Sequence, residues 1–241
     1  MCFSVNVNLV KEELENRYGA TLIDPESYRP SYYYHAFALP EIPVLCSGEP
    51  PSLKMLTWGL IPSWTRNLED ANEIRYKTFN ARSESIDSKP SFSSSFKTKR
   101  CIVPLRGFFE WQHVGKEKVP WYIYHADNEL LSVAGIYDEW SVNNTGEKFT
   151  TFSIVTTVAN KLMSEIHNHG KRMPAILDRD AELKWIDLST SPDDAKSLLR
   201  PSSENNLKAH TISPLVNSRT ANRNTPDVIK PHNYNQQQFL F

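Results

Sequence analysis

The pattern that most constrains this fold is a series of strand-like runs that are joined by turns and polar loops rather than by regular helices. Residues 3–9 alternate apolar and polar side chains with a period of two, which is typical of a half-buried strand. Further strand-like runs cover residues 42–45, 53–60, 101–109, 121–124, 131–136 and 150–158. Because a doubly wound fold would alternate strands with helices, the sequence predicts instead a β-rich α+β domain, with a curled or barrel-like mixed sheet and peripheral helices.

The remaining chain is assigned to peripheral helices and loops. The predicted helices cover residues 11–18, 159–166, 180–188 and 193–199. Residues 25–51 are rich in Pro and Tyr, and residues 85–99 contain six serines, so both stretches are expected to form mainly loops. Since the sequence has no repeat and no linker, we expect a single domain, residues 2–225, followed by a C-terminal tail, residues 226–241.

The composition narrows the classes of function. Lys and Arg total 27 against 28 Asp and Glu, so bulk charge cannot attract nucleic acid and any DNA contact must be a local patch. Three widely spaced cysteines without a CxxC motif argue against a disulfide framework and a closed zinc site. The sequence has neither a secretion signal nor an apolar stretch of about 20 residues. We therefore expect a cytoplasmic protein, nucleoid-associated if bacterial, with no membrane partner and no cofactor.

Cys2 is the first candidate for chemistry, because it directly follows the initiator Met. Cysteine is small enough for methionine aminopeptidase to remove that Met, which would leave Cys2 with a free α-amine beside its thiol. At ordinary pKa values of about 8 and 8.5, both groups are partly nucleophilic at neutral pH. Such a 1,2-aminothiol condenses with an aldehyde to an imine, which the thiol closes to a thiazolidine ring. The alternation places Cys2 on the polar face with Ser4 and Asn6, whereas a buried cysteine would be an inert small hydrophobe.

Polar side chains alternate in the segment TFNARSE, residues 78–84. If this segment is extended, Asn80, Arg82 and Glu84 share one face and combine an amide, a phosphate-matching guanidinium and a carboxylate. The alternative is a solvated strand edge.

Glu110 follows a strongly apolar strand in the segment GFFEW. Desolvation there would raise its pKa and allow the carboxyl group to act as an acid or a base. The alternative is a strand-end carboxylate that pairs with Arg100 or Arg106.

The segment from residue 166 to residue 177 contains His167 and His169, followed by Lys171 and Arg172. No second ligand cluster accompanies the histidines, so we expect no metal. A histidine with a pKa near 6.5 can move a proton, although a solvated loop histidine is the alternative. The two cations would suit phosphates.

Two tryptophans flank a turn that Pro62 stiffens. Trp58 is expected in the core. Trp64 could stack on an unpaired base, a contact worth about 1–3 kcal/mol in single-strand binders.

Together these segments resemble the SRAP family, the SOS-response-associated peptidase domain of proteins that shield abasic DNA. The resemblance covers roughly residues 2–220, and it rests on the order of the Cys after the initiator Met, WGLIPSW, FNARSE, GFFEW, AGIYDEW, IH…RMPAIL and TISPLVN. It implies a β-rich α+β fold with a basic groove.

The resemblance also implies roles for single residues. Cys2 would form a thiazolidine with the ring-opened deoxyribose aldehyde, and Asn80 would orient the N-terminal amine or the sugar. Glu110 would accept protons near Cys2. His167 would donate the proton that opens the sugar, and it is preferred over His169 because an Ile precedes it. Further implied DNA contacts are Arg82 and Arg172 on phosphates and Trp64 and Trp111 beside the distorted strand.

The chain departs from the family pattern at three places. Phe3 and Ser4 stand where many members have Gly-Arg, which removes one expected phosphate contact. The gap between His167 and Arg172 is longer than usual, and the region around Pro40, a further candidate DNA contact, matches weakly.

The leading hypothesis is a monomer that binds single-stranded DNA and captures abasic sites covalently, because an unpaired strand brings its aldehyde to the N-terminus at low deformation cost. A second hypothesis is a cysteine peptidase, acting on its own N-terminus, with Cys2 as nucleophile, His167 as base and Asn80 as orienting group. The resemblance to the SRAP family also implies a lyase-type activity. A third hypothesis is a non-catalytic nucleic-acid reader, whose binding is reversible and salt-dependent.

Overall fold

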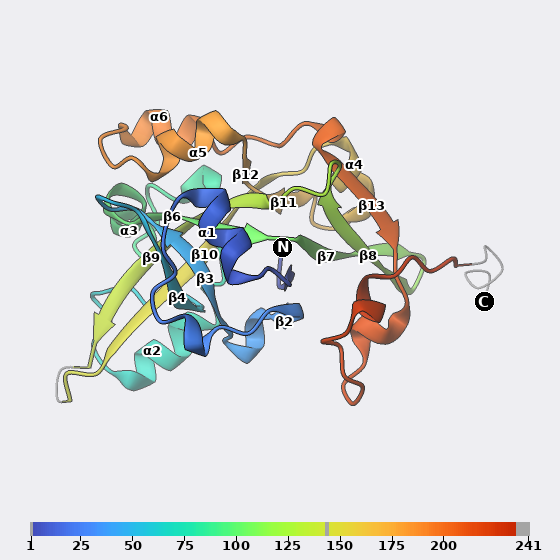
Figure 1. Ribbon diagram of the computed structural model, residues 1–241, viewed down its shortest axis with the longest axis horizontal. Coiled ribbons are helices and arrows are strands. Elements are labelled where there is room, and N and C mark those ends of the chain that lie inside the picture. The colour runs from blue at the N-terminus through green and yellow to red at the C-terminus, as the bar shows by residue number, and fades with distance from the viewer. Residues whose placement is uncertain (1, 143–144, 235–241) are drawn as a thin grey trace.

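The computed structural model describes residues 2–142 and 145–234, and its centre is a closed barrel of five strands (Figure 1). The barrel strands are β3 (Glu41–Cys46), β4 (Ser52–Trp58), β6 (Arg100–Leu105), β9 (Leu131–Ser141) and β10 (Lys148–Val158). They pair in the order β10-β4-β3-β6-β9, and the ring closes because β9 also pairs with β10. The β4–β10 pair is parallel and the other four pairs are antiparallel. The predicted barrel-like mixed sheet is confirmed.

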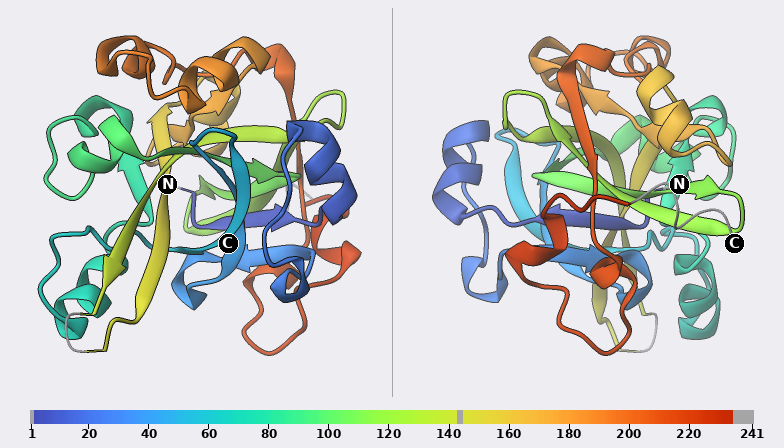
Figure 2. Two further views of the ribbon diagram at one scale, coloured as in Figure 1. Left: turned by 60° about the vertical axis from the view of Figure 1, so that its left-hand side comes forward. Right: turned by 90° about the vertical axis from the view of Figure 1, so that its right-hand side faces the viewer.

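A second sheet of five antiparallel strands lies beside the barrel and carries the N-terminus. Its order is β13 (Leu207–Thr211), β8 (Glu117–His125), β7 (Gly107–Val114), β1 (Ser4–Val7) and β2 (Ser31–His35). Strands β6 and β7 form the single run expected at residues 101–109, but the chain leaves the barrel at Arg106, whose N–H donates to the carbonyl of Asn6. Residues of the C-terminal segment, including the buried Val216 and Val228, pack on this sheet (Figure 2).

Strand β10 extends beyond the barrel and carries a short strand on each edge. On one edge, β4 pairs with Thr151 and Phe152, and β5 (Asn80–Arg82) continues beside residues 154–156. On the other edge, β9 pairs as far as Ile154, and β11 (Arg172–Pro174) takes residues 156–158. This extension of β10 brings the segment of residues 78–84 close to the segment of residues 166–177.

All four predicted helices are present near their expected bounds. They are α1 (Lys11–Tyr18), α4 (Lys161–Ile166), α5 (Arg179–Ile186) and α6 (Pro192–Ser197). The last three begin after Asn160, Asp178 and Ser191, whose side chains each accept a hydrogen bond from a first-turn N–H. The short strand β12 (Ile176–Leu177) pairs with β9. The 3₁₀ turns are Pro25–Ser27, Ala36–Ala38, Ser83–Ser85, Glu204–Asn206, Pro214–Asn217 and Pro226–Ile229.

The two stretches expected to be loops contain regular structure, so those expectations are wrong in part. Residues 25–51 contain β2 as well as β3, and residues 85–99 contain α3 (Ser93–Thr98). Helix α3 forms because Phe92 and Phe96, spaced four residues apart, are both buried. Helix α2 (Leu68–Arg75) was not expected either.

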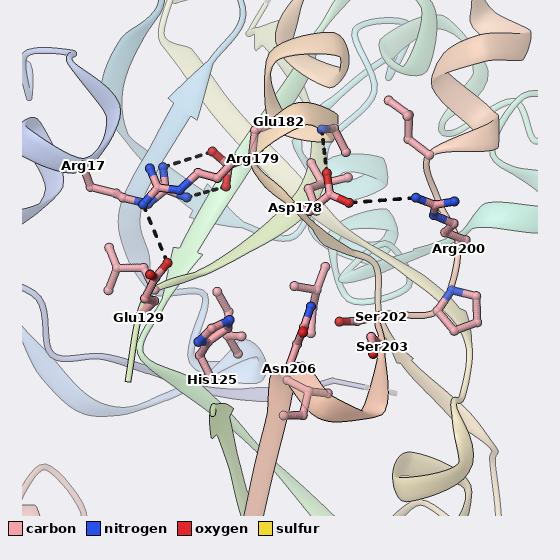
Figure 3. A pocket seen from close by; sticks show the side chains of 18 residues that line it. Arg17, His125, Glu129, Asp178, Arg179, Glu182, Arg200, Ser202, Ser203 and Asn206 are labelled. Atoms are coloured by element: carbon pink, nitrogen blue, oxygen red, sulfur yellow. Dashed lines mark hydrogen bonds and ion pairs between the residues drawn. The ribbon is translucent and has the colours of Figure 1, made fainter. Parts of the chain in front are cut away.

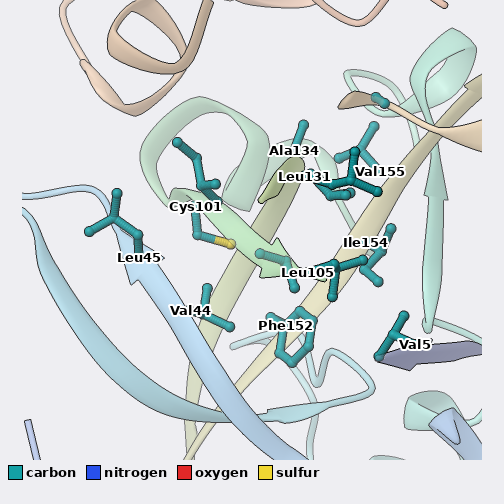
Figure 4. Packing of buried hydrophobic residues seen from close by; sticks show 14 of the residues in the cluster. Val5, Val44, Leu45, Cys101, Leu105, Leu131, Ala134, Phe152, Ile154 and Val155 are labelled. Carbon is teal, nitrogen blue, oxygen red and sulfur yellow. The ribbon is translucent and has the colours of Figure 1, made fainter. Parts of the chain in front are cut away.

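The hydrophobic core fills the barrel, and Val5 of β1 reaches the same cluster. Val44, Leu105 and Phe152 from three different barrel strands meet there (Figure 4). The predicted core position of Trp58 is confirmed, because the side chain is fully buried and its indole N–H donates to the Phe79 carbonyl at 2.9 Å.

The start of the expected tail is packed against the fold. Val228 is buried, and the N–H of His232 donates to the Thr211 carbonyl at 2.8 Å. The rest of the expected tail, residues 235–241, lies outside the described residues. Within the described chain, no helix is long and apolar enough to cross a membrane.

Candidate active site beside the N-terminus

Cys2 lies just before β1, and its residue surface is only 1% exposed. The expected polar outer face of β1 is wrong, because Ser4 and Asn6 are also buried. Strands β2 and β8 supply their partners: Ser4 Oγ lies 3.0 Å from His35 Nδ1, and Asn6 Nδ2 donates to the Tyr122 hydroxyl at 3.0 Å. The N-terminal strand is therefore held from both sides by polar contacts as well as by backbone pairing.

Asn80 binds the backbone of the candidate nucleophile. Its Nδ2 donates to the Cys2 carbonyl oxygen at 2.9 Å. Its Oδ1 is buried and has no hydrogen-bond partner among the described residues. An unsatisfied buried acceptor costs about 1–3 kcal/mol, so this amide oxygen is placed to accept a hydrogen bond from an amine or a sugar hydroxyl.

Glu110 lies in β7, next to the N-terminal strand, and is 4% exposed. The β1–β7 register pairs Val5 with Phe108, two residues before Glu110 in the same strand. Burial raises the pKa of Glu110 to about 7. Burial, and then the charge of Glu110, raise the pKa of the Cys2 thiol well above its usual range. The two groups therefore influence each other electrostatically in a desolvated site.

Neither arginine that could have paired with Glu110 does so. Arg106 forms an ion pair with Glu13, and the buried Arg100 donates to backbone carbonyls, among them that of Trp185 at 2.7 Å. The raised pKa of Glu110 is thus not offset by either cation.

His167 follows α4 directly, and its ring is held by the backbone of Arg172. Its Nδ1 lies 2.9 Å from the Arg172 carbonyl oxygen and 3.2 Å from the Arg172 nitrogen. Burial lowers the pKa of His167 below 6.5, so the imidazole is neutral at pH 7. The loop that carries it is tied to β7, since Asn168 exchanges hydrogen bonds with the backbone of His113 at 3.0 and 2.8 Å. His167 is thus brought to the strand of Glu110.

The other candidate histidine has a different position. His169 is exposed, and its ring stacks on that of His113 with centroids 5.0 Å apart. Because His167 is the half-buried ring with an oriented nitrogen, the geometry favours it over His169 as the proton-transfer group.

Arg172, expected on a phosphate, is buried and bonded to the protein. Its guanidinium forms a bidentate ion pair with Glu84, with N–O distances of 2.7 and 3.0 Å, and Nη2 donates to the Thr156 carbonyl at 2.6 Å. The guanidinium of Arg172 is therefore held by protein groups rather than presented for the expected phosphate contact.

The other expected DNA contacts lie at the surface. Trp64 is 55% exposed, and Arg82 is exposed at the end of β5. Trp111 is half-buried and donates its indole N–H to Asn217 Oδ1 at 2.8 Å.

A groove leads away from the N-terminus toward Trp64. Its first part, a cavity of about 460 Å³, is lined by the aromatic residues Phe3, Phe37, Tyr76, Phe79 and Phe92 and by the polar residues Asn80, Arg82, Lys77 and Lys89. Its second part, about 590 Å³, contains Trp64 and shares Lys77, Lys89 and Phe92 with the first. Aromatic surfaces beside cations suit a single strand of nucleic acid. In the second part, Lys77 and Arg66 pair with Glu73 and Asp70, which also line it.

The sequence did not indicate the aromatic wall of this groove. Phe37 and Tyr76 are about half exposed, and their rings lie 6.4 Å apart. They come from segments far apart in the chain, one of them expected to be a loop, so no local pattern could connect them. The three free cysteines are buried, and no group of three potential metal ligands occurs in the described ranges.

A separate cavity of about 490 Å³ lies between α5, β13 and the start of β9 (Figure 3). Its charged residues pair with one another, as Arg17–Glu182, Arg179–Glu129 and Arg200–Asp178. It contains none of the predicted site residues, and we assign it no part in the site.

Both the sequence and the fold are similar to those of known proteins. The profile of the SOS response associated peptidase (SRAP) family matches residues 1–219. "Abasic site processing protein YoqW" of Bacillus subtilis (strain 168) is 37% identical over 207 residues, which cover 85% of this chain and 88% of the relative. "Abasic site processing protein HMCES" of Xenopus tropicalis is 36% identical over 233 residues, with coverages of 85% and 67%. A crystal structure of a protein from Bacteroides thetaiotaomicron superimposes with a TM-score of 0.90 at 38% identity, and covers 96% of this chain and 100% of its own. The chain belongs to the SOS-response-associated peptidase (SRAP) family.

Proposed function

We propose that this protein binds single-stranded DNA and captures abasic sites covalently through Cys2, after removal of Met1. The observation that carries the proposal is the hydrogen bond from Asn80 to the Cys2 carbonyl, in a buried site that also contains Glu110. The names of the relatives, abasic site processing proteins, support the same substrate class.

The proposed reaction starts with the opening of the deoxyribose ring to its C1′ aldehyde. The neutral imidazole of His167 accepts the proton of the C1′ hydroxyl and returns it to the ring oxygen as the bond between C1′ and the ring oxygen breaks. The donor role that the resemblance implies for His167 is the second half of this step.

The capture step then releases one water and needs no oxidant or reductant. The Cys2 α-amine adds to C1′, and loss of the hydroxyl as water gives an imine. The thiol sulfur next bonds to C1′ while its proton is transferred to the nitrogen, which closes the thiazolidine ring. Glu110, with a pKa of about 7, exists in both forms near neutrality and can accept and return these protons.

The groove supports the preference for a single strand. Its aromatic and cationic lining offers surfaces for unpaired bases and for phosphates, while Asn80 at one end marks the place of the reacting sugar. In a duplex, the neighbouring base pairs cover the base faces that would otherwise stack on the aromatic rings of the groove.

The test uses a single-stranded oligonucleotide that contains uracil and is treated with uracil-DNA glycosylase. Wild-type protein should give an adduct that survives a denaturing gel, and its intact mass should equal the protein without Met1 plus the DNA minus one water. Cys2→Ala, Cys2→Ser and untreated DNA are the controls. Absence of a Cys2-dependent adduct, with Met1 removal verified by mass, would overturn the proposal.

The alternative of a cysteine peptidase is less well supported. A peptidase uses a thiolate, whereas burial and Glu110 raise the pKa of the Cys2 thiol. Turnover of peptides that depends on Cys2 and ignores abasic DNA would favour it.

A further inference from the structure

The ion pair between Glu84 and Arg172 joins two strands that lie on opposite edges of β10. Thr156 of β10 pairs with Arg82 of β5 on one edge and with Pro174 of β11 on the other. Glu84 lies in the 3₁₀ turn Ser83–Ser85 that follows β5, and Arg172 begins β11. Since both Glu84 oxygens bind the guanidinium, at 2.7 and 3.0 Å, the contact fixes orientation as well as distance.

The Arg172 side chain is fixed along its length by β10. Its Nη2 donates to the Thr156 carbonyl at 2.6 Å, and Nε lies 3.3 Å from Thr156 Oγ1. The hydrogen bonds from Arg172 keep the pKa of Glu84 below its usual range, so the carboxylate stays ionised at neutral pH. The guanidinium therefore has three anchoring groups, and only Glu84 is partly exposed.

The backbone of Arg172 in turn orients His167. Two contacts of His167 Nδ1 require opposite tautomers: the Arg172 N–H, at 3.2 Å, needs a lone pair on Nδ1, whereas the Arg172 carbonyl, at 2.9 Å, needs a proton there. The shorter contact, to the carbonyl, favours the proton on Nδ1. That tautomer leaves the lone pair on Nε2, which is the form that can accept the sugar hydroxyl proton.

The opposite end of the connection reaches Cys2. Asn80 pairs with Ile154 in the same β5 strand, four residues before Glu84, and donates to the Cys2 carbonyl. A continuous set of contacts thus runs from Cys2 through β5, Glu84 and Arg172 to His167.

We propose that Glu84 is a positioning residue, which through Arg172 sets the tautomer and the place of His167 relative to Asn80 and Cys2. The expected effect of Glu84 on the crosslinking rate rests on the proposed function. Its expected effect on the His167 tautomer can be measured in the free protein without DNA. The competing role, Arg172 as a phosphate ligand, would require the guanidinium to leave these partners.

The test compares Glu84→Ala and Glu84→Gln with Asp87→Asn. Asp87 is a matched control, because it lies three residues further on and forms its own ion pair with Lys196 at 2.5 Å. Long-range ¹H–¹⁵N NMR reports the His167 tautomer in the free protein, and single-turnover crosslinking at saturating abasic DNA reports the rate. Affinity for intact single-stranded DNA is measured in parallel.

We expect the Nδ1–H tautomer in wild type and in Asp87→Asn, and a mixture with Nε2–H in Glu84→Ala. Crosslinking should slow about 10- to 100-fold in Glu84→Ala and less in Glu84→Gln, with unchanged affinity for intact DNA. Glu84→Gln, which keeps one acceptor oxygen, serves where the alanine variant fails to fold.

Unchanged histidine signals and rates in both Glu84 variants would overturn the proposal. So would a gain of affinity for intact single-stranded DNA with an unchanged crosslinking rate at saturation, because that result assigns the guanidinium released from Glu84 to phosphate. Failure of wild type to form an adduct would instead contradict the proposed function, and the NMR comparison would still decide the positioning role.

Discussion

Glu110 titrates near neutral pH because burial raises its pKa to about 7. Its ionised form accepts protons, so the crosslinking rate should rise as the pH increases through about 7 and level off above it. Glu110→Gln should lower the single-turnover rate by about 10²- to 10⁴-fold and remove this limb of the pH profile. A variant that keeps the limb would show that another group is responsible.

The same shift links the stability of the fold to pH. The pKa of Glu110 rises from 4.5 to about 7, so between these values the native state binds a proton that the unfolded state has released. The contribution to the free energy of unfolding is complete below about 4.5 and is lost as the pH rises through about 7. Urea unfolding over this pH range should show that the free energy of unfolding depends less on pH in Glu110→Gln than in wild type. Parallel curves of unfolding free energy against pH would contradict the assignment.

Gly170 leaves room for the His167 ring. A Cβ at this position would lie 2.6 Å from both Cε1 and Nε2 of His167, so Gly170→Ala must displace the imidazole. We expect crosslinking to slow at least about tenfold, since a displacement of roughly 1 Å is enough for such a loss. His169→Ala, whose ring is exposed, should retain the wild-type rate. Equal losses in both variants would contradict the choice of His167.

Single residues were predictable where their chemistry is local. The place of Cys2 after Met1 and the apolar neighbours of Glu110 can be seen in the sequence, and the pKa of Glu110 is raised as expected. The burial of Ser4 and Asn6 could not be seen, because their partners His35 and Tyr122 come from distant strands.

At the scale of elements, β9 and β6 approach each other closely at Gly135. A Cβ there would meet Cys101 Sγ at 2.9 Å, Val103 Cγ2 at 3.0 Å and the Ser153 carbonyl at 3.2 Å. Gly135→Ala should therefore lower the free energy of unfolding by about 1–3 kcal/mol. Combining it with Cys101→Ala should cost less than the sum of the two single changes, which a double-mutant cycle in urea would reveal. Simple additivity would mean that the sulfur is not the obstacle.

The elements that the sequence missed have identifiable physical reasons. Tyr32, Tyr33 and Tyr34 of β2 are all partly buried, so the strand shows no alternation of apolar and polar side chains. Helix α2 has a cap, in which Asn67 Oδ1 accepts from the Asp70 N–H at 2.8 Å, but buries little beyond Ala71. Helix α1 has strong helix formers, and its bounds agree with the prediction.

At the scale of the whole molecule, charge is nearly balanced, with a formal net charge of −1, so we expect DNA affinity to depend on a local set of cations, such as those of the groove. Lys89 lines both parts of the groove. Lys89→Glu should weaken binding of intact single-stranded DNA and reduce the slope of log K against log salt by about 0.7, the value for one lost contact with a single strand.

Lys184→Glu is the matched control, because Lys184 is exposed on α5 and lines neither part of the groove. It changes the net charge equally but should leave affinity and slope unaltered. Equal effects of the two substitutions would show that overall charge, not the groove, attracts the strand.

The loop between α4 and β11 is closed at its base by the hydrogen bond from the Lys171 N–H to the His167 carbonyl at 2.8 Å. Its ends are therefore fixed to each other, whatever the number of residues between them. This explains how the chain accommodates a longer interval between His167 and Arg172. It also makes position 169, at the exposed turn of this loop, a suitable place for a fluorescent side chain that would report strand binding in real time.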